Sequence, residues 1–256
     1  MSYLVICAVA LLASGLTFFS GFGLGTLLLP AFALFFPIEQ AVAMTAIVHF
    51  LNGLFKLALV GRNADRRVVL RFGLPAILAA FVGAWVLFWL SGVEPLLSYH
   101  LFGREMRVTP VKLVVGLLLL LFALAELLPR FRDLSFGPRY LPVGGLLSGF
   151  FGGLSGMQGA LRSAFLAKSG LSKESFIATG VVVACLIDVA RLGVYSRSLL
   201  EGPRLDYGLI GAAVLSAFVG AYLGNRFLKK MTMRGIQRIV AILLFVVAVG
   251  LAFGIL

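Results

Sequence analysis

Long apolar segments separated by short polar loops run through the chain. Six segments supply the roughly 20 residues that a helix needs to cross a bilayer. They lie at 41–60, 70–92, 110–128, 175–195, 207–225 and 236–256. Because backbone groups inside a bilayer must hydrogen-bond within their own segment, this pattern predicts an all-α polytopic membrane protein. The strands of a transmembrane barrel would instead alternate apolar and polar residues.

Two further apolar segments, 3–36 and 142–167, contain glycine clusters near their middles. The first cluster runs from Ser20 to Gly25, and the second runs from Gly149 to Gly159. Glycine disfavours the interior of a helix and permits sharp turns. We therefore expect each segment to be a broken helix or a re-entrant helical hairpin. No Lys or Arg precedes the first segment, so we expect it to be retained rather than cleaved as a signal peptide.

The distribution of basic residues among the loops supports the hairpin at 142–167. If this segment crosses the membrane once, the two sides carry nearly equal numbers of Lys and Arg. If it returns to the side that it entered, 14 lie on one side and 5 on the other. The positive-inside rule favours the second arrangement and makes the richer side cytoplasmic. That side holds loops 61–71, 129–140, 168–174 and 226–238, opposite loops 37–40, 91–112 and 196–206.

The two halves of the chain align at an offset of 134 residues. Ser14 and Gly15 then match Ser148 and Gly149, and Thr45 matches Thr179. Each half, 1–129 and 140–256, has one glycine-broken segment and three spans. An odd number of crossings makes the second half upside down relative to the first. Inverted repeats with broken helices are typical of secondary transporters.

Composition narrows the class of protein. Of the 256 residues, 61% are hydrophobic and 12% are charged, which excludes a soluble globular domain. The net charge of +12 is concentrated in the loops, so we ascribe it to cytoplasmic retention of Lys and Arg and expect no nucleic-acid partner. The two cysteines form no CxxC or Cys/His cluster, so we expect no metal and no cofactor.

A polar stripe crosses the span 41–60. Thr45, His49, Asn52 and Lys56 follow one another at spacings that place them on one helical face. Polar groups are costly in a bilayer, so this face is expected to line a substrate path. Lys56 would attract an anion, Thr45 and Asn52 would hydrogen-bond to it, and His49 could carry a proton. The alternative is that Lys56 reaches the interface and His49 is simply buried.

Further candidate site residues lie in the second half. Arg162 lies just past the second glycine cluster, where a broken helix offers free N–H groups to an oxyanion, and Gln158 lies four residues before Arg162. Asp188 and Arg191 are three residues apart, so we expect them to pair on one helix face and to act in gating. Hydrogen bonds from Thr179, and backbone N–H groups exposed at the glycines, complete the expected binding site. These glycines are Gly21, Gly23, Gly25, Gly156 and Gly159.

The paired segments resemble the TauE/SafE sulfite exporter family of membrane permeases. The resemblance rests on the run from Gly21 to Gly25 with Pro30, on Ala43-Met44-Thr45, and on Ala178-Thr179-Gly180 in the second half. It covers nearly the whole chain. It implies a multi-pass transporter of the cell membrane (inner or plasma) that exports sulfite or an organosulfonate.

Two other functions remain open from the sequence. An anion channel would use the same residues with one gate in place of two. Gly153-Leu154-Ser155-Gly156 also resembles the nucleophile motif of rhomboid intramembrane proteases. In that family the histidine follows the serine, whereas His49 and His100 both precede it here, so we expect no enzyme. The expected partners are a small anion and the lipid bilayer, and the sequence leaves homo-oligomer formation open.

Overall fold

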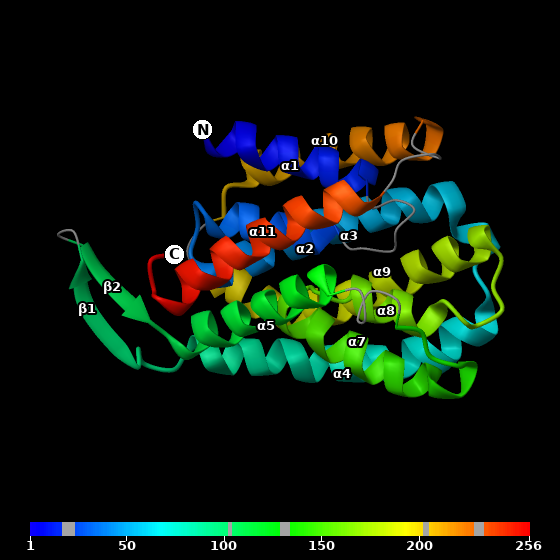
Figure 1. Ribbon diagram of the computed structural model, residues 1–256, viewed down its shortest axis with the longest axis horizontal. Coiled ribbons are helices and arrows are strands. Elements are labelled where there is room, and N and C mark those ends of the chain that lie inside the picture. Colours follow the sequence, from blue (N-terminus) through cyan, green and yellow to red (C-terminus); the bar gives the residue numbers. More distant parts are fainter. Residues whose placement is uncertain (17–23, 102–103, 129–133, 202–204, 228–232) are drawn as a thin grey trace.

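The computed structural model describes residues 1–16, 24–101, 104–128, 134–201, 205–227 and 233–256. Over these residues the protein is a bundle of helices with one two-stranded antiparallel sheet (Figure 1). The helices of the first half are α1 (Ser2–Leu16), α2 (Leu24–Ala33), α3 (Ile38–Val60), α4 (Arg66–Ser91) and α5 (Pro110–Leu127). Those of the second half are α7 (Leu141–Ser155), α8 (Gly159–Leu166), α9 (Lys173–Glu201), α10 (Tyr207–Phe227) and α11 (Met233–Ala252). Short 3-10 turns are η1 (Gly61–Asn63) and η2 (Pro138–Tyr140), and the strands are β1 (Leu97–Leu101) and β2 (Arg104–Val108).

The six expected spans correspond to α3, α4, α5, α9, α10 and α11. Within the described residues, four helical segments are long and apolar enough to cross a membrane. They are Ile38–Asn63, Arg66–Ser91, Lys173–Ser196 and Tyr207–Arg226. The shorter apolar helices α1, α2 and α5 pack among them. The protein is therefore a polytopic membrane protein, as the hydrophobic pattern predicts.

The long helices lie side by side, so the connections gather at two ends of the bundle (Figure 1). One end carries residues 61–65, 134–140 and 167–172, and we call it the basic end because Arg62, Arg139 and Lys168 lie there. The other end carries the sheet and the chain termini, and we call it the β end. The structure thus gathers at one end described parts of three of the four loops that charge counting assigns to the cytoplasm.

The second glycine segment folds as a helical hairpin. Helix α7 is capped by Gly156, whose φ of 80° is a left-handed conformation that favours glycine. Helix α8 starts three residues later, at Gly159. The hairpin closes at its base, because the Phe136 N–H donates to the Ala164 carbonyl at 3.1 Å. The Phe136 ring also stacks on Phe165, with centroids 4.3 Å apart. The predicted helix break is confirmed, and both ends of the hairpin lie at the basic end (Figure 1).

The first glycine segment also contains two helices, α1 and α2, which pack against each other. Residues 17–23 lie between them and include Gly21 and Gly23, so these two candidate ligands fall outside the described residues. The N-terminus and the end of α2 both lie at the β end (Figure 1). The two broken segments therefore enter the bundle from opposite ends.

Three glycines of α7 bring it into backbone contact with α4. A Cβ atom at Gly145, Gly149 or Gly153 would lie 2.1–2.2 Å from a carbonyl oxygen of α4. These oxygens belong to Phe72, Ala76 and Ala80. The four-residue spacing places the glycines on one face of α7, where small residues allow close helix packing. The glycine run therefore serves helix packing as well as the break at Gly156.

The expectation of an all-α fold needs one correction, because β1 and β2 pair as an antiparallel ladder from Leu97↔Val108 to Leu101↔Arg104. The ladder lies at the β end, beyond the apolar helices, where short strands can pair without crossing the bilayer (Figure 1). Arg107 hydrogen-bonds to Glu105 through two nitrogens, which lowers the pKa of the Glu105 carboxyl. The Tyr99 hydroxyl donates to the Phe253 carbonyl and ties the ladder to the C-terminal segment.

Candidate functional site

A buried ionic cluster lies where α3 crosses α9, near the middle of both helices. The Asp188 carboxylate is fully buried, and its Oδ2 lies 2.5 Å from His49 Nδ1. Its Oδ1 accepts from Arg191 Nε at 2.9 Å and lies 2.8 Å from Nη2. The expected pair between Asp188 and Arg191 is therefore present. The partnership with His49, from the other half of the chain, adds a third member.

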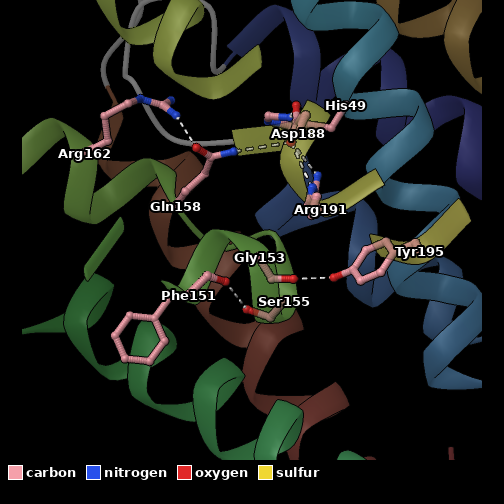
Figure 2. A network of polar contacts seen from close by, with 9 residues as sticks. All are labelled: His49, Phe151, Gly153, Ser155, Gln158, Arg162, Asp188, Arg191 and Tyr195. Atoms are coloured by element: carbon pink, nitrogen blue, oxygen red, sulfur yellow. Dashed lines mark hydrogen bonds and ion pairs between the residues drawn. The ribbon is translucent and has the colours of Figure 1, made fainter. Parts of the chain in front are cut away.

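The break between α7 and α8 extends this cluster, as Figure 2 shows. Gln158 Nε2 donates to Asp188 Oδ1 at 3.4 Å, and Gln158 Oε1 accepts from Arg162 Nη1 at 3.0 Å. The Ser148 hydroxyl donates to the Gln158 carbonyl at 3.2 Å and holds the turn. A continuous polar chain thus joins Arg162 to Asp188. It depends on the break, because Gln158 lies two residues after the left-handed Gly156 and directly before the first residue of α8.

The two glycine segments meet beside this cluster. A Cβ atom at Gly25 would lie 3.1 Å from the Gly156 carbonyl oxygen and 3.6 Å from His49 Cδ2. A Cβ atom at Gly156 would lie 2.6 Å from Arg191 Nη1. Larger side chains at either glycine would therefore push apart the segments that hold the ionic groups. Gly159 is buried as the first residue of α8.

The rest of the α3 stripe continues toward the basic end. Asn52 Oδ1 accepts a hydrogen bond from the Ser14 hydroxyl at 3.1 Å, and Lys56 Nζ donates to the Ser14 carbonyl at 3.5 Å. Asn52 and Lys56 are both buried, so the stripe faces the protein interior, as its spacing predicts.

Toward the β end, two buried donors lack hydrogen-bond acceptors among the described residues. They are the Thr45 hydroxyl and Arg191 Nη1. Thr45 lies one turn from His49, and Arg191 lies one turn from Asp188. Because α3 and α9 are antiparallel and His49 meets Asp188, Thr45 and Arg191 lie at the same level of the bundle. Unpaired buried donors are costly, so this level is suited to accept an oxyanion.

Thr179 lies on α9 directly before Gly180, where a Cβ atom would lie 3.4 Å from Arg162 Nε. Its hydroxyl accepts from the backbone N–H of Asp65 at 2.9 Å, near the basic end. Asp65 in turn caps α4 by accepting from the Val68 N–H at 2.9 Å. The geometry therefore gives Thr179 a role in holding the η1 turn against α9.

Ser155, the serine of the GxSG sequence, is also engaged locally. Its hydroxyl donates to the Phe151 carbonyl of its own helix at 3.1 Å, while His49 is held by Asp188 (Figure 2). A serine nucleophile needs a base within hydrogen-bond reach of its hydroxyl. The observed partners of Ser155 and His49 do not form that arrangement.

The charge balance of the cluster is positive. Among the described residues, the buried charged side chains are Lys56, Arg162 and Arg191 as cations and Asp188 as the anion, with His49 beside them. Buried charges require counter-charges, so an excess of cations favours binding of an anion. The described residues contain no group of three His, Cys, Asp or Glu side chains that could hold a metal ion. The arrangement is suited to bind a small oxyanion with guanidinium and amide donors.

The sequence did not reveal four features of this site, which are one contact between the two halves and the roles of three hydroxyl side chains. The contact between His49 and Asp188 joins residues 139 positions apart, and no local pattern indicates it. Roles for Ser14, Ser148 and Tyr195 were not predicted either, because hydroxyl groups are common in membrane helices and their partners here are backbone atoms or distant side chains. The Tyr195 hydroxyl donates to the Gly153 carbonyl (Figure 2). The sequence signal for Tyr195 was its position four residues after Arg191, which places both side chains on one face of the helix.

Apolar spans, broken helices and a buried cationic centre together define a membrane transport protein. The family model for the sulfite exporters TauE/SafE matches residues 6–251, so the chain belongs to this family. The family assignment agrees with the resemblance in the glycine segments. It makes the protein a member of a family of membrane exporters of sulfite or related sulfur compounds. No individual curated protein matches the chain.

Proposed function

We propose that the protein is a secondary transporter that exports a small sulfur oxyanion, sulfite or an organosulfonate, across the cell membrane. The observation that carries this proposal is the excess of buried cations over carboxylates at the crossing of α3, α9 and the second helical hairpin. Family membership supports export of a sulfur compound. The basic end would face the cytoplasm, since basic loops are retained there.

The proposed anion site lies between the two glycine segments. Lys56 and Arg162 supply positive charge, and Thr45, Asn52 and Gln158 supply hydrogen bonds. Gly25, Gly156 and Gly159 allow the backbone to approach the anion, and the start of α8 adds the positive end of a helix. Thr179 is a further proposed donor, because a hydroxyl that accepts from the Asp65 N–H can also donate a hydrogen bond.

The triad of His49, Asp188 and Arg191 is the proposed coupling element. In this structure the Asp188 carboxylate is paired with the Arg191 guanidinium. A substrate anion must therefore compete with Asp188 for Arg191. A proton taken up by His49 or Asp188 would weaken this pair and release Arg191 for the substrate. Proton and anion binding then favour each other, because linkage between two sites is reciprocal.

Alternating access would follow from inverted repeats at 1–129 and 140–256. Two observations support this symmetry. Helix α1 packs on α10 as α7 packs on α4, and α5 packs on α11, so pairs of equivalent helices recur. The two broken segments also enter from opposite ends (Figure 1). Rocking of one repeat against the other would open the site to each side in turn.

Lys56→Met and Arg162→Met test the proposed binding site. Each change removes a cation that is expected to contact the anion, and a charged hydrogen bond contributes about 1.5–3 kcal/mol, so sulfite flux should fall about tenfold or more. Flux is measured in proteoliposomes at matched protein content. Lys112→Met is the control, because Lys112 Nζ donates to the Arg107 carbonyl at the exposed β end. Wild-type flux in both Lys56→Met and Arg162→Met would refute the assignment.

A further inference from the structure

The structure contains a pocket at the β end that no part of the proposed binding site uses. It has a volume of about 470 Å³ and lies between the start of α3, the end of α4 and Tyr195 of α9. Glu39 and Ala43 line it from α3, and Leu87 and Phe88 line it from α4. If the basic end faces the cytoplasm, this pocket opens on the outer side of the membrane.

Tyr195 separates this pocket from the ionic cluster. Its side chain lines the pocket, yet the residue is only 5% exposed, so it forms part of the buried floor. The hydroxyl donates to the Gly153 carbonyl, three residues before the left-handed turn at Gly156. This hydrogen bond joins α9 of the cluster to the helical hairpin whose break supplies Gln158.

The level directly beneath Tyr195 carries two of the buried donors that lack a hydrogen-bond acceptor among the described residues, the Thr45 hydroxyl and Arg191 Nη1. Arg191 lies one helical turn below Tyr195 on the same face of α9, and its Nη1 lies beside Gly156. Thr45 of α3 lies at the level of Arg191, and Ala43, two residues earlier, lines the pocket. A path from the pocket to the cluster therefore leads past Tyr195 to Arg191 and Thr45.

We propose that this pocket is the outer vestibule of the transport path and that Tyr195 is the gate between the vestibule and the buried anion site. The hydrogen bond from Tyr195 to Gly153 holds the gate closed. Its release would separate α9 from α7 at the β end and connect Arg191 and Thr45 with the outer solution. This inference rests on the proposed transport function for its occupant, which is the anion leaving the central site.

Thiol labelling tests the gate without measuring transport. Ala43→Cys and Thr45→Cys are each made in a background in which Cys7 and Cys185 are serine. A membrane-impermeant methanethiosulfonate that carries a sulfonate is applied from the outer side to the protein in sealed vesicles. We expect rapid labelling at position 43, in the vestibule, and slow labelling at position 45, behind the gate.

Tyr195→Phe then removes only the hydroxyl. Loss of one hydrogen bond should shift the opening equilibrium about fivefold, so labelling at position 45 should accelerate by about that factor. Labelling at position 43 should stay constant. Tyr222→Phe is the matched control, because Tyr222 is exposed on α10 and accepts from Arg226 Nη1. Elution as a single species in gel filtration confirms that each variant is folded.

Two results would overturn the proposal. Absence of labelling at position 43 would mean that the pocket is filled by lipid rather than water. Equal labelling at position 45 with Tyr195 and with Tyr195→Phe would mean that Tyr195 is not the gate. Labelling does not depend on which substrate is carried. Failure to transport sulfite with an unchanged labelling pattern would therefore contradict the proposed function and leave the vestibule in place.

Discussion

Asp188→Asn is expected to abolish proton-coupled transport and to destabilise the protein strongly. The amide keeps the shape of the carboxylate but removes the negative charge that contacts both Arg191 and His49. Removing one member of a buried ion pair leaves the other charge without compensation, at a cost of about 3–5 kcal/mol. Thermal unfolding in detergent and pH-dependent flux in proteoliposomes measure the two effects.

A second variant separates stability from coupling. Asp188→Asn combined with Arg191→Gln removes both charges, so it should recover much of the lost stability while transport stays absent. Glu105→Gln is the control for a carboxylate, because its pair with Arg107 is exposed at the β end and should not affect unfolding or flux. An Asp188→Asn protein with wild-type unfolding and wild-type pH-dependent flux would contradict the role of the triad.

Gly149→Val is expected to prevent assembly of the helical hairpin with α4. A Cβ atom at this position would lie 2.1 Å from the Ala76 carbonyl oxygen, and backbone cannot move aside as a flexible side chain can. Overpacking in a dense interior costs about 1–3 kcal/mol and more where the neighbour is fixed. We expect aggregated protein, or a protein that unfolds at a much lower temperature, in gel filtration and thermal unfolding.

Gly211→Val is the matched control for this substitution. Gly211 lies within α10 and has open space where a Cβ atom would lie, so the same change tests helix propensity alone. It should elute and unfold nearly as the wild type does. If Gly149→Val behaved like Gly211→Val, the close packing of α7 on α4 would be refuted.

The sequence predicted most helices because apolar length and glycine clusters are features of neighbouring residues in the chain. Apolar length located α3, α4, α9 and α10 to within a few residues, and the glycine cluster located the break at Gly156. The packing of Gly149 on α4 was not predicted, because the same glycines were interpreted only as helix breakers. The β1–β2 ladder was missed for a related reason, since two five-residue strands are too short to stand out in a loop between long apolar helices.

The candidate site was predicted in part. The spacing of Thr45, His49, Asn52 and Lys56 identified the inward face of α3, because helical periodicity fixes which residues share a face. Which residues meet across helices depends on packing, and no periodicity encodes it. The pairing of His49 with Asp188 therefore required the structure. The same limit applies to Thr179, whose ligand role stays a prediction and whose contact with the backbone N–H of Asp65 was visible only in the structure.

Flux of radiolabelled sulfite into proteoliposomes, with and without an imposed pH gradient, tests directly whether the protein is a coupled exporter of sulfur oxyanions. We expect flux well above that of protein-free liposomes, which saturates with sulfite and increases when the gradient is imposed. Saturation would separate a carrier from an open channel. Flux equal to that of protein-free liposomes, for sulfite and for a panel of organosulfonates, would contradict the proposed function.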